Sequence, residues 1–142
     1  MKIASDALEA VAATLVMDYS RTMTMTEADI SNHYRKTTLP LMIYNGPSDI
    51  AIEFEGAQII DVIACEVFFL VKMTTKDMLG DEVDELLEIT KRLADKTYAE
   101  LNTDTIVAKD ILPYTLEAVE VMTDMFVGHK MLIGLPFYNE GC

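Results

Sequence analysis

The sequence predicts an α+β fold in which a mostly antiparallel sheet packs against two amphipathic helices within a single domain, residues 1–142. Two long apolar stretches, residues 58–73 and 111–137, are typical of β structure. Between them, residues 81–101 repeat apolar side chains at helical spacing. A chain of 142 residues fits one domain, because domains most often contain about 100–150 residues.

The composition combines a strong negative charge with a high apolar content. The chain has 24 acidic and 11 basic residues, a net charge of −13, and a mean hydropathy of +0.20. This charge repels phosphate backbones and anionic membrane surfaces, which disfavours direct binding to nucleic acid. A small domain buries only part of its apolar content alone. We therefore expect some of that content, including some of the ten methionines, to be buried against protein partners.

The sequence contains no recognisable targeting signal and no metal-binding pattern. The opening residues, MKIASDALEA, lack the continuous apolar run of a signal peptide, and no stretch approaches the roughly 18–20 apolar residues of a membrane span. Cys65 lies in an apolar stretch and Cys142 is the last residue, without the spacing of a disulfide framework or a metal clamp. We therefore expect synthesis in the cytoplasm, no metal and no cofactor.

A first helix is predicted from Ala7 to Tyr19. Asp6 is the expected N-cap, and Glu9 completes a capping box three positions later. One apolar stripe then recurs at helical spacing and consists of Leu8, Val11, Ala12, Leu15 and Tyr19.

The next segment, residues 20–39, has low apolarity and forms a candidate extended arm. Alternating threonines and methionines from Thr22 to Thr26 favour a short strand, whereas Thr26 followed by Asp29 favours a short helix. Loops of this length in compact domains usually serve in binding. The interface residues predicted in this arm are Met23, Met25 and Tyr34.

Two short strands are predicted after the arm. They run from Leu41 to Tyr44 and from Ile50 to Phe54, with a strong turn signal at Asn45-Gly46-Pro47-Ser48 between them. The second strand should end at Glu55-Gly56.

Residues 58–73 predict one long strand, or two strands with a bend near residues 61–64. One face of the second half is wholly apolar and should be core, and it consists of Cys65, Val67, Phe69, Val71 and Met73. Phe68 and Leu70 lie on the opposite face and are predicted to be buried against the helix or a partner. These two side chains complete the predicted interface.

The central helix carries acidic residues in its first turn and Lys91, Arg92 and Lys96 in its second half, the order that the helix dipole favours. Asp81 is its expected cap. Its predicted buried stripe consists of Val83, Leu86, Leu87, Thr90, Leu93, Ala94 and Leu101. The acidic run from Asp77 to Glu88 lacks the register of a calcium-binding EF-hand loop, and a solvated helix start explains it better.

The chain returns to strands near its end. Pro113 limits how early along the chain the first of these strands can pair with a neighbouring strand. Thr123-Asp124 marks a bend, and Gly128 indicates a bulge or a close approach of two backbones. An alternating apolar face then consists of Val127, His129, Met131, Ile133, Leu135 and Phe137.

No constellation in the sequence indicates catalysis. His33 and His129 both lack a neighbouring His or Cys at the spacing of a metal clamp. The chain contains no nucleophile elbow, no P-loop and no glycine-rich dinucleotide turn. We therefore expect that the protein is not an enzyme.

The order of elements is helix, short strands, long apolar strand, amphipathic helix and terminal strands. It closes with VEVMTDMFVGHKMLIGLPF, a strand, a break carrying Asp, a Gly and a final apolar strand. This order resembles the tail-terminator and tail-completion proteins of tailed bacteriophages, over most of residues 1–138. The insertion at residues 20–39 departs from the simplest form of that pattern.

The resemblance implies a structural virion protein, a protomer of an oligomeric ring at the phage neck or tail end that joins head and tail. It implies a homo-oligomer whose other partners are virion structural proteins, located in the neck or tail region of the virion after synthesis in the host cytoplasm. Sequence-specific nucleic-acid binding and a membrane location are not expected.

A rival interpretation is a small acidic inhibitor that imitates the phosphate array of DNA and binds a nucleic-acid enzyme. Such a mimic should spread its carboxylates along one surface, whereas six crowd the start of one helix here. This interpretation therefore ranks second. A third interpretation, a small enzyme or a ligand-binding domain, is supported by no particular residue of the sequence.

Overall fold

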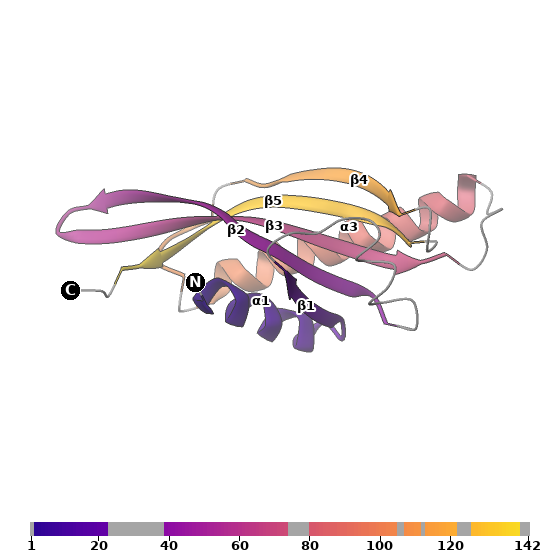
Figure 1. The fold of residues 1–142 in the computed structure, drawn as a ribbon, viewed down its shortest axis with the longest axis horizontal. Helices are drawn as coiled ribbons and strands as arrows, with labels where there is room; N and C mark the ends of the chain where they lie inside the picture. The colour runs from indigo at the N-terminus through magenta and orange to yellow at the C-terminus, as the bar shows by residue number, and fades with distance from the viewer. Residues whose placement is uncertain are drawn as a thin grey trace.

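The computed structural model describes residues 2–22, 39–73, 80–104, 107–111, 113–121 and 126–139. The elements follow in the order shown in Figure 1: α1 (Lys2–Thr14), β1 (Asp18–Thr22), β2 (Leu41–Glu55), β3 (Gln58–Lys72), α3 (Gly80–Thr103), β4 (Thr115–Val121) and β5 (Phe126–Tyr138). The predicted α+β class is confirmed.

The five strands form one sheet in the order β1-β2-β3-β5-β4. β1 pairs with β2 in parallel, and the other neighbours are antiparallel, so the prediction of a mostly antiparallel sheet is correct. Both helices contribute to the hydrophobic cluster on one face of this sheet, Ala4 and Leu8 from α1 and Ala94 and Leu101 from α3. We call this face the helix face and the opposite one the back face.

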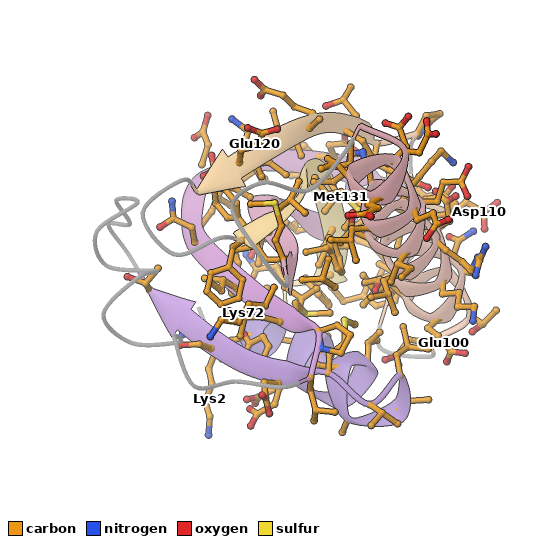
Figure 2. All side chains as sticks on the ribbon, turned by 90° about the vertical axis from the view of Figure 1, so that its right-hand side faces the viewer. Lys2, Lys72, Glu100, Asp110, Glu120 and Met131 are labelled. Carbon is orange, nitrogen blue, oxygen red and sulfur yellow. The ribbon has the colours of Figure 1, made fainter. Side chains whose placement is uncertain are left out.

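Alternation along the strands assigns each side chain to one of the two faces. The predicted core face of β3 is confirmed, because its five members from Cys65 to Met73 are all buried. The alternating face of β5 joins it, and Figure 2 shows Met131 between the sheet and α3, while Glu120 and Asp110 lie at the outer surface. A smaller apolar cluster on the back face consists of Leu41, Ile43, Leu70 and Phe126, with Phe68 and Val119 packed against it.

The boundaries predicted for the first helix are wrong at both ends. α1 begins at Lys2 rather than Ala7, so Asp6 lies inside the helix and is not its cap. It ends at Thr14 because Val16 adopts φ of 59°, the left-handed conformation that terminates helices. The amide of Met17 donates to the Ala12 carbonyl over 2.8 Å, and the amide of Val16 donates to the Ala13 carbonyl over 3.3 Å. These are the two bonds of a Schellman cap.

Tyr19 was predicted in the stripe of the first helix and instead lies in β1. Its hydroxyl is 2.7 Å from the hydroxyl of Ser5 on α1, so the strand and the helix remain linked. The candidate arm therefore starts with a described strand through Thr22, and its residues 23–38 lie outside the described residues.

The predicted turn at residues 45–48 is wrong. β2 runs continuously from Leu41 to Glu55, and the register slips between Asn45, which pairs with Glu66, and Asp49, which pairs with Ala64. The intervening residues are accommodated as a bulge. Gly46 supports it with φ of 157°, a conformation open mainly to glycine.

The remaining predicted elements are confirmed with shifted ends. Residues 58–73 form one strand, β3, which ends at Lys72. The central helix extends from Gly80 to Thr103, so Asp81 lies in its first turn and is not its cap as predicted. Its buried side chains include Thr97, which the predicted stripe omitted. Gly128 marks a close approach of two strands, as predicted, whereas Thr123-Asp124 lies outside the described residues.

Candidate interaction surface

A β-hairpin made by the second half of β2 and the first half of β3 projects beyond both helices (Figure 1). Its strands pair from Asp49 with Ala64 to Glu55 with Gln58. The two-residue turn Gly56-Ala57 joins them, and Gly56 has φ of 62°, which glycine adopts without the steric cost of a Cβ atom.

The helix face of this hairpin is exposed and mostly apolar, with one acidic residue, Asp61, opposite Ile52. Ile52 is 62% exposed and Phe54 is 76% exposed, the latter directly opposite Ile59 on β3. Ile50 precedes them on the same face and is also exposed. We call Ile50, Ile52, Phe54 and Ile59 the hairpin patch. Contiguous exposed apolar side chains of this kind usually mark a binding surface.

The back face of the same hairpin is held by the chain itself. Lys109 forms an ion pair with Glu53, and the amide of Ala108 donates to the Pro136 carbonyl over 2.9 Å. Ile60, which pairs with Glu53 on one side and Tyr138 on the other, is fully buried. The hairpin is therefore anchored on its back face, whereas its helix face is exposed at Ile52 and Phe54.

The outer edge of the hairpin is open within the described part of the chain. β1 pairs with β2 only from Leu41 to Asn45, before the bulge. Among the described residues no strand pairs with the outer edge of residues 49–55. An open edge presents backbone donors and acceptors to another chain.

A shallow hollow of about 430 Å³ lies on the back face of the sheet. Its centre is formed by Ala64 and Gly134, which lie directly opposite each other on β3 and β5. Leu132, which is 47% exposed, and Thr115 form the next pair along the same face. We call it the back-face hollow. It exists because the two central residues carry almost no side chain.

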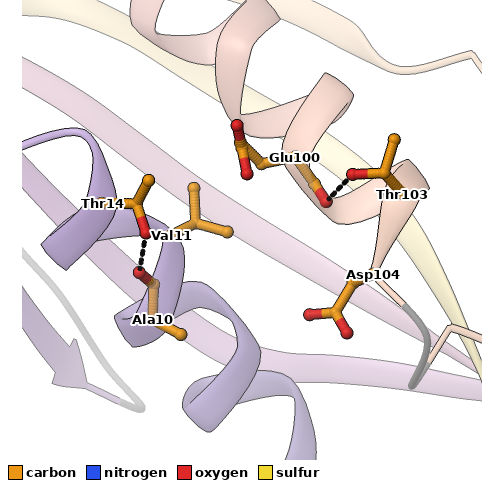
Figure 3. Close-up of a pocket in the computed structure, with 6 residues that line it drawn as sticks. All are labelled: Ala10, Val11, Thr14, Glu100, Thr103 and Asp104. Carbon is orange, nitrogen blue, oxygen red and sulfur yellow. Dashed lines mark hydrogen bonds between the residues drawn. The ribbon is translucent and has the colours of Figure 1, made fainter.

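A second concave site of about 350 Å³ lies between the last turns of α1 and α3 (Figure 3). The hydroxyls of Thr14 and Thr103 donate to carbonyls of their own helices, so they are already satisfied. Glu100 and Asp104 make the site acidic. Within the described residues no group of three acidic, His or Cys side chains is arranged to hold a metal ion.

The buried titratable side chains on the helix face are shielded from solvent. Burial raises the pKa of the Cys65 thiol to about 11, and the thiol lies 3.8 Å from the Tyr44 hydroxyl. Burial also raises the pKa of Tyr44, whose ring lies under the guanidinium of Arg21 at 5.5 Å. A thiol with such a pKa remains protonated and is a poor nucleophile at neutral pH.

His129 connects the sheet to α3. The hydroxyl of Thr90 donates to the Leu87 carbonyl over 3.1 Å and lies 2.8 Å from Nδ1 of His129. Because that hydroxyl has one hydrogen, Nδ1 of the histidine carries the proton and donates it to Thr90. Burial lowers the pKa of His129, and the nearby Lys91 lowers it further.

Next to this pair, Asp95 accepts hydrogen bonds from Lys91 and from the hydroxyl of Tyr114. The bond from Lys91 is the larger cause of the lowered pKa of Asp95, and burial raises the pKa of Tyr114 to about 12. These groups attach β4 and β5 to the helix, which is a structural role.

The predicted interface residues divide into two sets. Met23, Met25 and Tyr34 lie outside the described residues, as do His33 and Cys142. Leu70 is fully buried and Phe68 half-buried, both in the back-face cluster of the same chain. The structure therefore places these two together on the face away from the helices, and it does not bring them near the hairpin patch.

Sequence reasoning missed the hairpin patch. The alternation Ile-Ala-Ile-Glu-Phe over residues 50–54 predicted a strand, which is correct. It did not show that this strand continues through the bulge and leaves the body of the protein. The only local signal was the strand pattern beside a glycine turn.

No protein-family model matches this sequence, and no curated protein matches it either. Within the described residues, neither helix combines the length and apolarity needed to span a bilayer. The fold and its exposed hairpin are therefore the basis for a functional proposal.

Proposed function

We propose that this chain is a structural virion protein, a protomer of an oligomeric ring at the neck or tail end of a tailed bacteriophage that joins head and tail. The observation that supports it best is the hairpin patch. A hairpin that carries Ile52 and Phe54 away from the core exposes apolar area that a partner would remove from water.

The order of elements also supports this proposal. The chain runs from α1 through a long β2–β3 hairpin to α3 and a final antiparallel pair, β4 and β5. The resemblance to phage tail-terminator and tail-completion proteins rests on a helix, short strands, a long apolar strand, a helix and terminal strands, and the chain departs from that order in having one long strand, β2, after β1. The net charge of −13 suits a ring around a channel for DNA, because it repels the phosphate backbone.

The test is native mass spectrometry of the purified protein across a range of concentrations, with negative-stain imaging of any oligomer. A closed oligomer of identical subunits with a central opening is expected. A monomer at every concentration, bound to a DNA-processing enzyme in a pull-down, would favour the acidic inhibitor instead.

A charge-reversal variant separates these two functions. Glu82, Asp84 and Glu85 are exposed in the first turns of α3, far along the chain from the hairpin. Replacing all three with lysine should abolish a DNA mimic and leave a ring intact. Phe54→Asp should have the opposite effect.

A further inference from the structure

We propose that Asn45 is a site of spontaneous deamidation, that folding slows the reaction there, and that its product loosens the hairpin at its junction with the rest of the sheet. Deamidation at this residue does not depend on the function proposed above, because it needs only the chain itself and water. The residues involved are Asn45, Gly46 and Glu66, which lie where the hairpin leaves the rest of the sheet.

The reaction takes place at the peptide bond between Asn45 and Gly46. The Gly46 nitrogen attacks Cγ of Asn45 and closes a five-membered succinimide ring, while the bond from Cγ to Nδ2 breaks and ammonia leaves with the proton of the Gly46 nitrogen. Water then adds across one of the two ring bonds to that nitrogen, which gives aspartate or isoaspartate and one new negative charge at neutral pH. Glycine favours the attack because it has no side chain to shield its nitrogen.

The folded chain keeps Asn45 away from this reaction. Nδ2 of Asn45 donates a hydrogen bond to Oε1 of Glu66 over 3.1 Å, and pairing with β3 keeps the backbone of Asn45 extended. The neighbouring Gly46 is buried. The side chain of Asn45 must turn towards the Gly46 nitrogen to react, so the pairing between Asn45 and Glu66 has to open first.

The bulge makes this opening easier than it is in a regular strand. Residues 46–48 of β2 lie opposite residue 65 of β3, so the pairing is interrupted immediately after Asn45. The pairing of β1 with β2 also ends there, with Thr22 opposite Asn45. In addition, Oδ1 of Asn45 is buried without a hydrogen-bond partner among the described residues, which lowers what the closed state gains from this side chain.

A carboxylate in place of the Asn45 amide does not fit the closed structure. The donor to Glu66 is replaced by an acceptor, so two carboxylates face each other across the strands in a half-buried site. Asp49 lies on the same face just beyond the bulge and adds a third negative charge. Like charges directly opposite each other on neighbouring strands are destabilising. Deamidation therefore hinders the pairing from closing again, and isoaspartate also lengthens the backbone by one carbon.

The first experiment compares the native chain with the urea-unfolded chain in mildly alkaline buffer and follows deamidation by peptide mass spectrometry. In the unfolded chain, Asn45 should react faster than Asn102, because the β-branched Thr103 shields the nitrogen that follows Asn102. In the native chain, Asn45 should react at least about tenfold more slowly than in the unfolded chain, because the rate follows the population of the open state.

Three outcomes of this experiment overturn the proposal. An unfolded chain that does not react at Asn45 shows that the residue is not a deamidation site. A native chain that reacts as fast as the unfolded one shows that folding does not slow the reaction. A native chain without product after prolonged incubation shows that the bulge does not open.

The second experiment uses Asn45→Asp to imitate the product and Glu66→Gln to remove the opposing charge. Asn45→Asp should lower Tm by at least about 3 °C, and adding Glu66→Gln should restore at least half of that loss, because the glutamine amide can donate to the new carboxylate. Glu66→Gln alone is the matched control, since it retains an acceptor for the Asn45 amide, and its Tm should stay within about 1 °C of the wild type. An Asn45→Asp variant as stable as the wild type, or a loss that Glu66→Gln does not restore, overturns the proposed effect.

Hydrogen exchange locates the change within the sheet. In Asn45→Asp, the amides of residues 49–55 and 58–64 should exchange faster than in the wild type, whereas those of β4 should be unchanged. If Asn45→Asp does not fold, its double variant with Glu66→Gln takes its place and should show the exchange of the wild type. An equal loss of protection over the whole sheet overturns the proposal, because the product then does not act on the hairpin in particular.

Discussion

Gly128 on β5 and Phe69 on β3 approach each other so closely that a Cβ atom on the glycine would lie 1.8 Å from the Phe69 carbonyl oxygen. The obstacle is backbone, which cannot rotate away as a side chain can. The close approach lies near one end of the β3–β5 pairing, where Gly128 is opposite Leu70.

Gly128→Ala should therefore destabilise the protein by about 3 kcal/mol or more, at the upper end of overpacking effects. Urea unfolding followed by circular dichroism measures this change. Gly134→Ala is the matched control, because its Cβ would meet only the side-chain atom Cγ1 of Val62 at 3.1 Å, and it should cost less than about 1 kcal/mol. Equal losses in both variants would contradict this account.

Val16→Gly should stabilise the protein. Val16 is exposed and holds φ of 59°, which is costly for a β-branched residue, whereas glycine adopts it freely. The gain in the free energy of unfolding should be about 0.5–1 kcal/mol, after allowance for the greater freedom of glycine in the unfolded chain. The free energy of unfolding of Val16→Ala should lie between those of the wild type and Val16→Gly. A Val16→Gly variant less stable than the wild type would show that the left-handed conformation of Val16 does not strain the folded protein.

The stability of the protein should depend on His129 in mildly acidic solution. Burial holds its pKa below the ordinary 6.5, so the unfolded chain binds a proton more readily than the folded one. The contribution of His129 is fully present above the ordinary pKa, and it is lost as pH falls through the lowered folded pKa.

Comparing the free energy of unfolding of the wild type and His129→Asn between about pH 7 and pH 5 isolates this effect. The asparagine amide can donate to Thr90 in place of Nδ1 but does not titrate in this range. The difference between the two proteins should narrow as pH falls, and a constant difference would mean that the histidine pKa is not lowered.

Cys65 should be unreactive in the folded protein. With a pKa of about 11, roughly one thiol in a thousand is ionised at about pH 8, and the side chain is buried as well. In a Cys142→Ser background, a thiol-specific dye should label the native chain negligibly and the urea-unfolded chain completely. Rapid labelling of the native protein would show that the core around Tyr44 opens easily.

Salt should strengthen assembly if copies associate as proposed. Two subunits of net charge −13 repel each other, and raising salt from about 0.01 M to about 0.15 M shortens the Debye length from about 30 Å to about 8 Å. Sedimentation velocity should therefore show larger oligomers at the higher salt concentration. Dissociation by salt would indicate that the interface depends on ion pairs rather than on the apolar patch.

The elements best predicted from the sequence are those with a strong internal period. The apolar alternation of residues 65–73 identified the core face of β3, and the helical spacing of residues 81–101 identified α3, because both patterns reflect burial on one side of a regular element. Gly128 was also recognised, because a glycine inside a strand indicates a bulge or close backbone approach.

The errors arose where distant contacts override local preference. The sequence Asn45-Gly46-Pro47-Ser48 favours a turn locally, but pairing with β3 on both sides keeps β2 extended and turns the extra residues into a bulge. Likewise, Tyr19 fits the stripe of a helix, but pairing of β1 with β2 removes it from α1 and Val16 closes the helix.

The sequence by itself determined the fold class, the two helices and the faces of the central strands, because periodicity and glycine positions act over a few residues. Only the tertiary structure decided which apolar side chains remain exposed to solvent. Ile43 and Ile52 lie in the same strand, yet one is fully buried and the other is 62% exposed. Exposure depends on which segments reach each face, and on the helix face neither helix extends over the end of the hairpin (Figure 1).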